Sequence, residues 1–205
     1  ALLAGREAAA PAVQAVVAAQ VRGSLQLSGL AETPEAPALE AALHRASSAV
    51  DPKAPLTVAA IVAWQAALTG GGEFRSQPRE RVDGPPPAPP EFIASRLAVL
   101  ESWMAADSAR ELKPAQQGAL ALARITEILP FDRGNGMLAR LAASHLMVRA
   151  GTRPPILVGT DAARLRAALT AAYQLETEPL SRLLDDAAER ALDVLLAAHE
   201  KPSAP

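Results

Sequence analysis

Alanine is unusually dense in this chain, where it occupies 48 of the 205 positions. Because alanine has the most favourable helix propensity of all residues, this density favours a mostly helical protein. A chain of this length suits one domain and can bury a sizeable hydrophobic core. We therefore expect an all-α fold.

The charge balance and the cysteine count exclude several classes of protein. Charged residues make up 20% of the chain and the net charge is -2, with half of the residues hydrophobic, which argues against bulk disorder and against a general nucleic-acid binder. The absence of cysteine excludes disulfide scaffolds, cysteine zinc sites and thiol catalysis. No apolar run long enough to span a membrane and no signal-peptide pattern is found. We expect a cytoplasmic protein.

Helical periodicity, proline positions and capping residues divide the chain into helices. Gly23 is expected to end the first helix and Pro34 to end the second, and Thr57 and Asp161 are expected N-caps. The last helix is amphipathic and is a candidate oligomer interface. The predicted helices are 6–22, 24–32, 37–48, 57–68, 91–106, 115–128, 137–149, 161–173 and 180–199.

Residues 73–90 are the least helical part of the chain. They include six prolines, and the run at 85–90 contains five of them. Such a run favours an extended polyproline conformation. The segment is expected to be a stiff connector, or an extended surface that a partner protein binds.

The loop at 130–136 contains the pattern from which we infer chemistry. Gly134 and Gly136 flank Asn135 and permit positive φ angles, so that successive amides can converge on an anion. The following helix adds its positive dipole end, and Arg133 and Arg140 lie on either side. The pattern indicates a phosphate or carboxylate site, although the same residues also make ordinary turns.

The segment 129–140, Leu-Pro-Phe-Asp-Arg-Gly-Asn-Gly-Met-Leu-Ala-Arg, resembles the Fic (Fido) family signature H-P-F-x-[D/E]-G-N-G-R-x-x-R. Further landmarks agree in order, and the resemblance covers roughly residues 24–155. These landmarks are Gly72-Glu73-Phe74-Arg75, the prolines of 85–90, residues 123–128 and Arg149-Ala150-Gly151.

The resemblance implies a Fic-type helical bundle with a short β-hairpin flap, which Phe74 and Arg75 would enter and which would align a target protein. It also suggests a single domain over 1–205. In that division, 1–50 hold N-terminal helices, 51–155 the Fic core and 156–205 C-terminal helices.

In the resembled family, the motif histidine is the general base for transfer of AMP from ATP to a protein hydroxyl. Leu129 stands at that position and cannot accept a proton. Arg133 replaces the acidic residue that holds magnesium, and a cation cannot ligate Mg²⁺. Met137 replaces the first motif arginine, whereas Arg140 is retained. The resemblance therefore implies a pseudoenzyme with no catalytic residue and no metal site.

Few nearby groups could substitute for those that are lost. Asp132 is one residue from the acidic position, and Arg133 could neutralise phosphates directly. His145 is expected to be a structural, half-buried histidine, and His44 and His199 are expected to be ordinary surface or capping residues.

Near the N-terminus, Ser28 and Glu32 fit the inhibitory S-x-x-x-E motif of the resembled family. There the glutamate pairs with the second motif arginine, which would be Arg140. Thr33 replaces the usual glycine or asparagine after the glutamate. The alternative is that Glu32 is a solvated carboxylate at a helix end.

Three functions follow. The first is a degenerate Fic-fold protein that lacks AMP transfer but retains ATP, another nucleotide or phosphate at Gly134, Asn135, Gly136, Arg140 and Arg133, without Mg²⁺. The second is an active nucleotidyl or phosphoryl transferase that modifies a protein hydroxyl by non-standard chemistry. The third is a non-enzymatic interaction module with a partner at the flap. None of them involves nucleic acid or a membrane.

Overall fold

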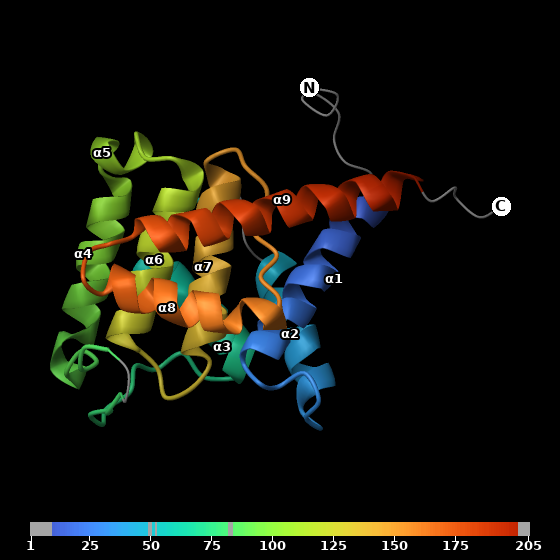
Figure 1. Ribbon diagram of the computed structural model, residues 1–205. Helices are drawn as coiled ribbons and strands as arrows, with labels where there is room; N and C mark the ends of the chain where they lie inside the picture. Colours follow the sequence, from blue (N-terminus) through green and yellow to red (C-terminus); the bar gives the residue numbers. More distant parts are fainter. Residues whose placement is uncertain (1–9, 49–50, 52, 82–83, 201–205) are drawn as a thin grey trace.

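The computed structural model describes residues 10–48, 51, 53–81 and 84–200, and within them the chain is helical and has no strand (Figure 1). This confirms the expected all-α class. The α-helices are α1 (Ala10–Leu27), α2 (Ala36–Ser48), α3 (Val58–Thr69), α4 (Ile93–Ala105), α5 (Asp107–Arg110), α6 (Pro114–Ile128), α7 (Asn135–Arg149), α8 (Ala162–Ala172) and α9 (Glu178–Glu200). Two short 3-10 helices, η1 (Pro90–Phe92) and η2 (Gly159–Asp161), precede α4 and α8.

Helices α6 and α7 form the centre of the bundle. They pack against each other, α4, α8 and α9 pack on α6, and α1 and α3 pack on α7 (Figure 1). Fully buried aliphatic side chains, including Leu122, Ile125, Leu138 and Leu146, fill the space between them. The loop between α6 and α7 is the motif loop, 129–134, and this packing fixes both of its ends.

Helix α1 is continuous where two helices were expected. It passes through Gly23 to Leu27, so the separate helix at 24–32 is wrong; residues 6–9 lie outside the described part of the chain. A Cβ at Gly23 would lie only 1.8 Å from the carbonyl oxygen of Leu157. The glycine therefore permits close contact between α1 and the segment after α7, and it does not end the helix.

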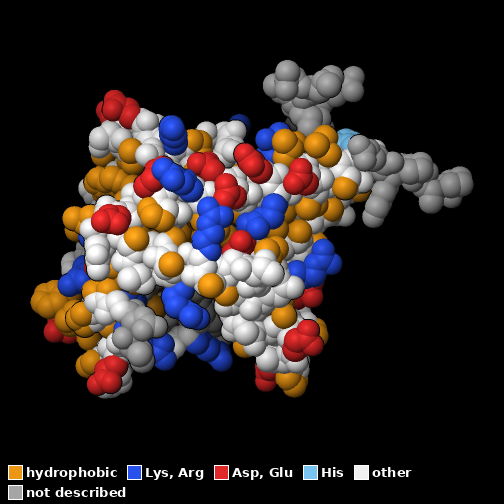
Figure 2. All heavy atoms as spheres, viewed as in Figure 1, with side chains coloured by type: hydrophobic (Ala, Val, Ile, Leu, Met, Phe, Trp, Pro, Cys, Tyr) orange, Lys and Arg blue, Asp and Glu red, His pale blue; other side chains and the backbone are white. Residues whose placement is uncertain are grey.

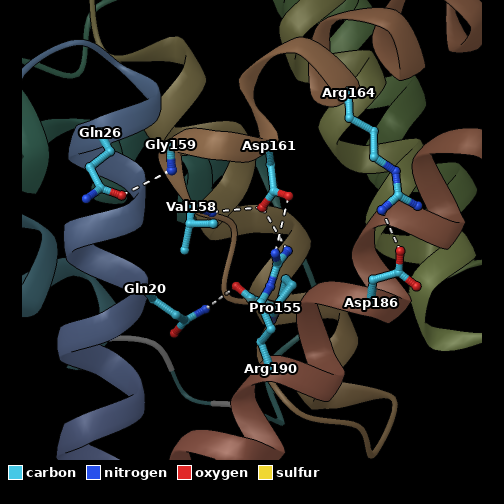
Figure 3. Close-up of polar contacts among 9 residues, drawn as sticks. All are labelled: Gln20, Gln26, Pro155, Val158, Gly159, Asp161, Arg164, Asp186 and Arg190. Atoms are coloured by element: carbon cyan, nitrogen blue, oxygen red, sulfur yellow. Dashed lines mark hydrogen bonds and ion pairs between the residues drawn. The ribbon is translucent and has the colours of Figure 1, made fainter.

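Polar side chains of α1 form hydrogen bonds with residues 155–159, the segment after α7 (Figure 3). The Nε2 of Gln20 donates to the carbonyl oxygen of Pro155 at 3.1 Å. The Oε1 of Gln26 accepts from the amide of Gly159 at 3.1 Å. Two hydrogen bonds and one backbone contact thus hold α1 against residues 155–159.

The opposite side of this segment is anchored to α9 (Figure 3). Asp161 forms an ion pair of 2.8 Å with Arg190 and accepts from the amide of Val158 at 2.9 Å. A second ion pair joins Arg164 of α8 to Asp186 of α9 at 2.5 Å. Residues 155–161 therefore connect α1 to α9.

The structure does not show the expected β-hairpin flap. Residues 71–81 and 84–89 contain neither helix nor strand among the positions described. A hairpin requires two strands that exchange backbone hydrogen bonds. Here the carbonyl oxygens of Gln77 and Ala88 instead accept hydrogen bonds from the side chain of Arg75.

The expected start of α3 agrees with the structure, whereas the expected start of α7 does not. Thr57 caps α3, since its Oγ1 accepts from the amide of Ala60 at 3.1 Å. Helix α7 begins at Asn135, two residues before the expected start.

None of the described helices is both long and apolar enough to cross a membrane.

Candidate functional site: the motif loop and its arginines

The motif loop leaves α6 through a left-handed residue and enters α7 through another. Leu129 has φ 48° and ψ 64°, a conformation that costs a leucine energy because of its Cβ. Gly134, at φ 79° and ψ -5°, is the N-cap of α7 and adopts its conformation without that cost. The two reversals turn the chain back so that α7 runs antiparallel to α6.

Asn135 closes the loop on itself. Its Oδ1 accepts from the amide of Phe131 at 3.0 Å, and its Nδ2 donates to the carbonyl oxygen of Phe131 at 2.7 Å. The residue is only 5% exposed. The side chain of Asn135 thus holds the loop's shape, whereas the anion site expected at this residue is formed by backbone amides.

The backbone amides at the start of α7 remain available. The N–H groups of Asn135, Gly136 and Met137 have no acceptor within the described residues, and no side chain caps the helix. They lie at the positive end of the helix dipole. These amides can bind an anion.

Arg140 lies one turn further along α7 and bonds to hydroxyl and carbonyl groups of α1. Its Nε donates to Ser24 Oγ at 3.0 Å, and its Nη2 donates to Ser24 Oγ, to the Ser24 carbonyl oxygen and to Ser28 Oγ at 2.8–2.9 Å. Burial lowers its pKa from 12.5 to about 10, so it stays protonated at neutral pH.

The remaining guanidinium nitrogen of Arg140 lies close to the loop. A Cβ at Gly136 would be 3.3 Å from Nη1 of Arg140, and no acceptor for Nη1 is present in the described part of the chain. The side chain also lines a cavity of about 40 Å³ between α1, α2 and α7. A charged donor is therefore beside the free amides of α7.

The structure does not bring Glu32 to Arg140. Glu32 is exposed in the turn after α1, and the ion pairs of the described residues do not join the two. Helix α1 ends at Leu27, and the Oγ1 of Thr33 donates to the Leu30 carbonyl oxygen at 3.0 Å. The expected pair is replaced by serine contacts, of which Ser28 belongs to the predicted motif and Ser24 does not.

Arg133 bonds to a different helix from Arg140. Its Nη2 donates to the carbonyl oxygen of Thr69, at the C-terminal end of α3, at 2.8 Å. The Nε2 of buried Gln65 donates to the Arg133 carbonyl oxygen at 2.9 Å. Arg133 and Arg140 were expected to bind the same anion. In the structure Arg133 instead bonds to α3 and Arg140 bonds to α1.

An open cleft of about 430 Å³ lies between the motif loop and residues 70–76. Its walls include Phe74, Asp132 and Arg133, and the ring of Phe74 is 5.5 Å from that of Phe131. Asp132 and Arg133 are both exposed here. The cleft places an accessible surface directly beside the loop.

Arg75, expected at the flap, is instead a buried support for the loop. It is 2% exposed, and its Nε donates to the Leu129 carbonyl oxygen at 2.7 Å. Its Nη2 donates to the carbonyl oxygens of Ile128 and Ala88, and its Nη1 to that of Gln77. Burial lowers the pKa of Arg75.

Arg81 completes the support at the end of α6. It donates to the carbonyl oxygens of Thr126 and Glu127, and its guanidinium lies 4.9 Å from the ring centroid of Tyr173. Helix ends leave four carbonyls without helical partners. Arg75 and Arg81 together bond to four consecutive carbonyls, from Thr126 to Leu129.

The histidine nearest to the motif in the sequence is buried and engaged in structural contacts. The Nε2 of His145 is 2.9 Å from the Ala54 carbonyl oxygen, and the ring packs edge-on at 5.2 Å from Trp64. His145 is 4% exposed, more deeply buried than expected, in a structural environment. Met137 is buried as well. Within the described residues, no three His, Asp or Glu side chains are grouped to hold a metal.

Sequence reasoning missed Ser24, Gln65 and Arg81. Ser24 could have been found, because it lies four residues before Ser28 and thus on the same face of a helix. Arg81 and Gln65 act on partners 45 and 68 residues away, and no local pattern marks such contacts.

This chain is similar in sequence to a known family and to known proteins. Residues 55–147 match the Fic/DOC family model. Protein adenylyltransferase Fic from Drosophila grimshawi is 32% identical over 128 residues, 62% of this chain and 26% of that protein. The same enzyme from Culex quinquefasciatus is 31% identical over 135 residues, 66% of this chain and 27% of that protein. The chain thus spans about a quarter of the length of these curated relatives.

Solved structures share the fold at lower identity. Fic-1 from C. elegans (residues 134–508) gives a TM-score of 0.77 at 20% identity and covers 96% of this chain and 67% of its own. A Fic-domain-containing signaling protein from Bacteroides thetaiotaomicron gives a TM-score of 0.77 at 20% identity, covering 94% and 90%. The family model, the aligned adenylyltransferases and the common fold together show that this chain contains a Fic (Fido) domain of the Fic/DOC family.

Proposed function

We propose that this Fic domain is a pseudoenzyme that binds the phosphates of a nucleotide at the motif loop and does not transfer AMP. The observation that carries the proposal is the juxtaposition of free amides at the start of α7 with Nη1 of Arg140. Amides at a helix N-terminus and an arginine are both donors that suit phosphate oxygens. The curated relatives that the chain matches are protein adenylyltransferases.

Transfer of AMP to a hydroxyl group requires removal of the hydroxyl proton. Leu129 occupies the position where the family signature has histidine, and an aliphatic side chain cannot accept a proton. His145 is buried and held at the Ala54 carbonyl, so it cannot take over this role. We therefore expect the domain to bind a nucleotide without removing a proton from a hydroxyl group of a target protein.

The residues present supply several donors for the phosphates of a nucleotide and, in the motif loop, only one carboxylate, Asp132, for magnesium. The loop amides and Arg140 supply donors to phosphate oxygens, whereas Mg²⁺ needs oxygen ligands in near-octahedral geometry. Arg133 contributes no oxygen from its side chain, and Asp132 is a single exposed carboxylate. Arg133 would add positive charge near the phosphates, since only its Nη2 is engaged, at the Thr69 carbonyl oxygen.

The contacts of Arg140 suggest how binding is limited. Ser24 and Ser28 hold Nε and Nη2, which leaves only Nη1 free. A phosphate that recruits the whole guanidinium must displace these hydroxyls. Because hydroxyls are neutral acceptors, they compete less strongly than a carboxylate would.

Calorimetric titration of ATP, with and without Mg²⁺, tests this function. Wild-type protein should bind ATP equally in both conditions, and Arg140→Ala should weaken binding by about 10- to 100-fold because a charged donor is lost. Arg124→Ala is the matched control, since Arg124 is an exposed arginine paired with Glu127 on α6 and should leave binding unchanged.

Intact-mass analysis after incubation with ATP tests the absence of transfer. No adduct of AMP should appear on the protein. An adduct on the wild type that Arg140→Ala abolishes would show an active transferase with different chemistry. Absence of ATP binding by the folded wild type would contradict the binding part of the proposal.

A second candidate is recognition of a protein segment in the cleft beside Phe74. The cleft is open, and Glu73 and Ser76 in its wall are exposed. Substitution of Glu73 and Ser76 by alanine tests this role without loss of Arg75, which supports the loop. Unchanged recovery of bound protein by the double variant would count against it.

A further inference from the structure

The hydroxyl group of Ser28 lies at the surface and bonds directly to Arg140. Ser28 is the first residue after α1, in the mostly exposed turn that leads to α2. Its Oγ accepts from Nη2 of Arg140 at 2.8 Å and donates to the carbonyl oxygen of Ser24 at 2.9 Å. An accessible hydroxyl is therefore within hydrogen-bond distance of the arginine beside the motif loop.

Ser24 bonds to the same guanidinium but is much less accessible than Ser28. It is 8% exposed and lies within α1, whereas Ser28 is exposed and outside the helix. An enzyme that modifies a side chain must reach it, and surface turns offer such access where buried helical positions do not. Of the two serines that contact Arg140, only Ser28 is placed for modification.

Arg140 has neutral partners where a cation could have a charged one. In the part of the chain that the structure describes, no carboxylate forms an ion pair with Arg140. Its partners there are the serine groups of α1, and Nη1 has no acceptor among these residues. Hydrogen bonds between an arginine and an anion are stronger than those to neutral acceptors. Arg140 would therefore bind an anion placed at Ser28 more strongly than it binds the hydroxyl.

A phosphoryl group on Ser28 would lie at this guanidinium. Its bridging oxygen would be Oγ, which already contacts Nη2, and the other three oxygens would lie only one phosphorus atom further away. Arginine binds phosphate oxygens through pairs of N–H groups, and Nη1 is 3.3 Å from where a Cβ of Gly136 would lie, at the start of α7. The phosphate would thus take the arginine donors that a nucleotide phosphate needs.

The charges of the turn itself oppose such a phosphate. It would lie at the negative end of the α1 dipole, and Glu32 and Glu35 in the same turn are exposed carboxylates. Figure 2 shows acidic side chains at the lower right of the molecule, where the turn between α1 and α2 lies in Figure 1. Solvent and salt screen exposed carboxylates, whereas half-buried Arg140 is in direct contact with Ser28. We expect the direct contact to dominate.

We propose that Ser28 is a regulatory phosphorylation site and that its phosphate, bound by Arg140, excludes a nucleotide from the motif loop. The phosphoryl donor is ATP, and the catalyst is a separate protein serine kinase. The Ser28 Oγ forms a bond to the γ-phosphorus, the bond from this phosphorus to the β–γ bridging oxygen breaks, ADP leaves with that electron pair, and the hydroxyl proton passes to solvent. This inference rests on the function proposed above, because it assigns a regulator to the same phosphate site.

Calorimetric titration of ATP into protein with genetically encoded phosphoserine at position 28 tests the exclusion. Compared with unmodified protein, ATP binding should weaken by about 10- to 100-fold, because the charged donors are already occupied. Ser95 on α4 provides the matched control, since it is exposed and its hydroxyl also donates to a backbone carbonyl, that of Phe92. Phosphoserine at position 95 adds the same charge and should leave ATP affinity unchanged.

Phosphorus NMR detects the contact between the phosphate and Arg140 without ATP. The signal of phosphoserine 28 is followed against pH, since the second ionisation of a free phosphoserine has a pKa of about 6. A neighbouring cation favours the dianion, so the midpoint should be lower in the wild-type background than in Arg140→Ala. Circular dichroism would verify that both proteins are folded.

The two measurements separate this proposal from the function on which it rests. Failure of unmodified protein to bind ATP would contradict the proposed function, whereas the phosphate site at Ser28 is judged by the midpoint alone. Equal midpoints in the two backgrounds overturn the site. The exclusion of the nucleotide is overturned if phosphoserine 28 leaves ATP affinity unchanged, or if phosphoserine 95 lowers it as much.

Discussion

The motif loop has an arginine on each side, and the two are used in opposite ways. Arg75 is 2% exposed, and each of its hydrogen bonds goes to a backbone carbonyl, at the end of α6 or in the 75–88 segment. Arg140 is only half-buried, bonds largely to hydroxyl groups and keeps Nη1 beside Gly136. An arginine with every donor committed to the backbone supports a structure, whereas one with an open donor next to free amides can meet a ligand.

Replacement of Arg75 should produce the largest effect. Arg75→Met removes the donors to buried carbonyls at both ends of the 75–88 segment, and unpaired buried polar groups are costly. We expect the free energy of unfolding to fall by about 3–5 kcal/mol. Urea denaturation would measure it.

Arg79→Met is the control for this experiment, because Arg79 lies in the same segment but is exposed. It should change stability by less than about 0.5 kcal/mol. Equal losses in the two variants would show that Arg75 has no special structural role.

A second substitution is expected to displace α1, the helix whose serines bond to Arg140. Gly23→Ala places a methyl group 1.8 Å from the Leu157 carbonyl oxygen, so α1 or the 155–158 segment must move. Overpacking of this kind costs about 1–3 kcal/mol. Thermal denaturation would measure the loss, and displacement of α1 should also change ATP affinity.

Gly71→Ala is a suitable comparison, since a Cβ there meets only the flexible side chain of Glu73, at 3.2 Å. Its stability should stay close to that of the wild type. If Gly23→Ala is equally stable, α1 does not pack on the 155–158 segment as closely as described.

His145 provides a pH-dependent test on the far side of α7. Burial lowers its pKa below the ordinary value of 6.5, although the Ala54 carbonyl and Asp51 act in the opposite direction. As the pH falls below 6.5 the unfolded chain binds this proton before the folded chain does, so folding stability decreases. One proton limits the slope to about 1.4 kcal/mol per pH unit.

The measurement is the free energy of unfolding between neutral and mildly acidic pH, for wild type and His145→Gln. Glutamine can still donate to the Ala54 carbonyl but does not titrate, so the variant should lose this part of the pH dependence. An identical slope in both proteins would mean that other groups cause it.

Features that depend on local sequence could be predicted, whereas features that depend on distant contacts could not. Periodicity, proline and capping residues located most helices, and the glycine pattern with its family resemblance located the loop. The continuity of α1 through Gly23 depends on contact with Leu157, which is 134 residues away in the chain. The structural role of Arg75 likewise depends on carbonyls more than 50 residues away, so neither could be inferred from local sequence.

The smallest expected effect distinguishes the serine contacts from the predicted glutamate pair. Ser24→Ala combined with Ser28→Ala frees Nε and Nη2 of Arg140 from hydroxyl oxygens, so more donors are available to a phosphate. ATP affinity should rise a few-fold, which corresponds to less than about 1 kcal/mol. Glu32→Ala should leave affinity unchanged, because Glu32 is exposed and does not contact Arg140. Calorimetry on the three proteins decides the point: if Glu32→Ala tightens binding and the serine variant does not, then Arg140 is restrained by the carboxylate in solution, and the motif inferred from the sequence acts as it does in the resembled family.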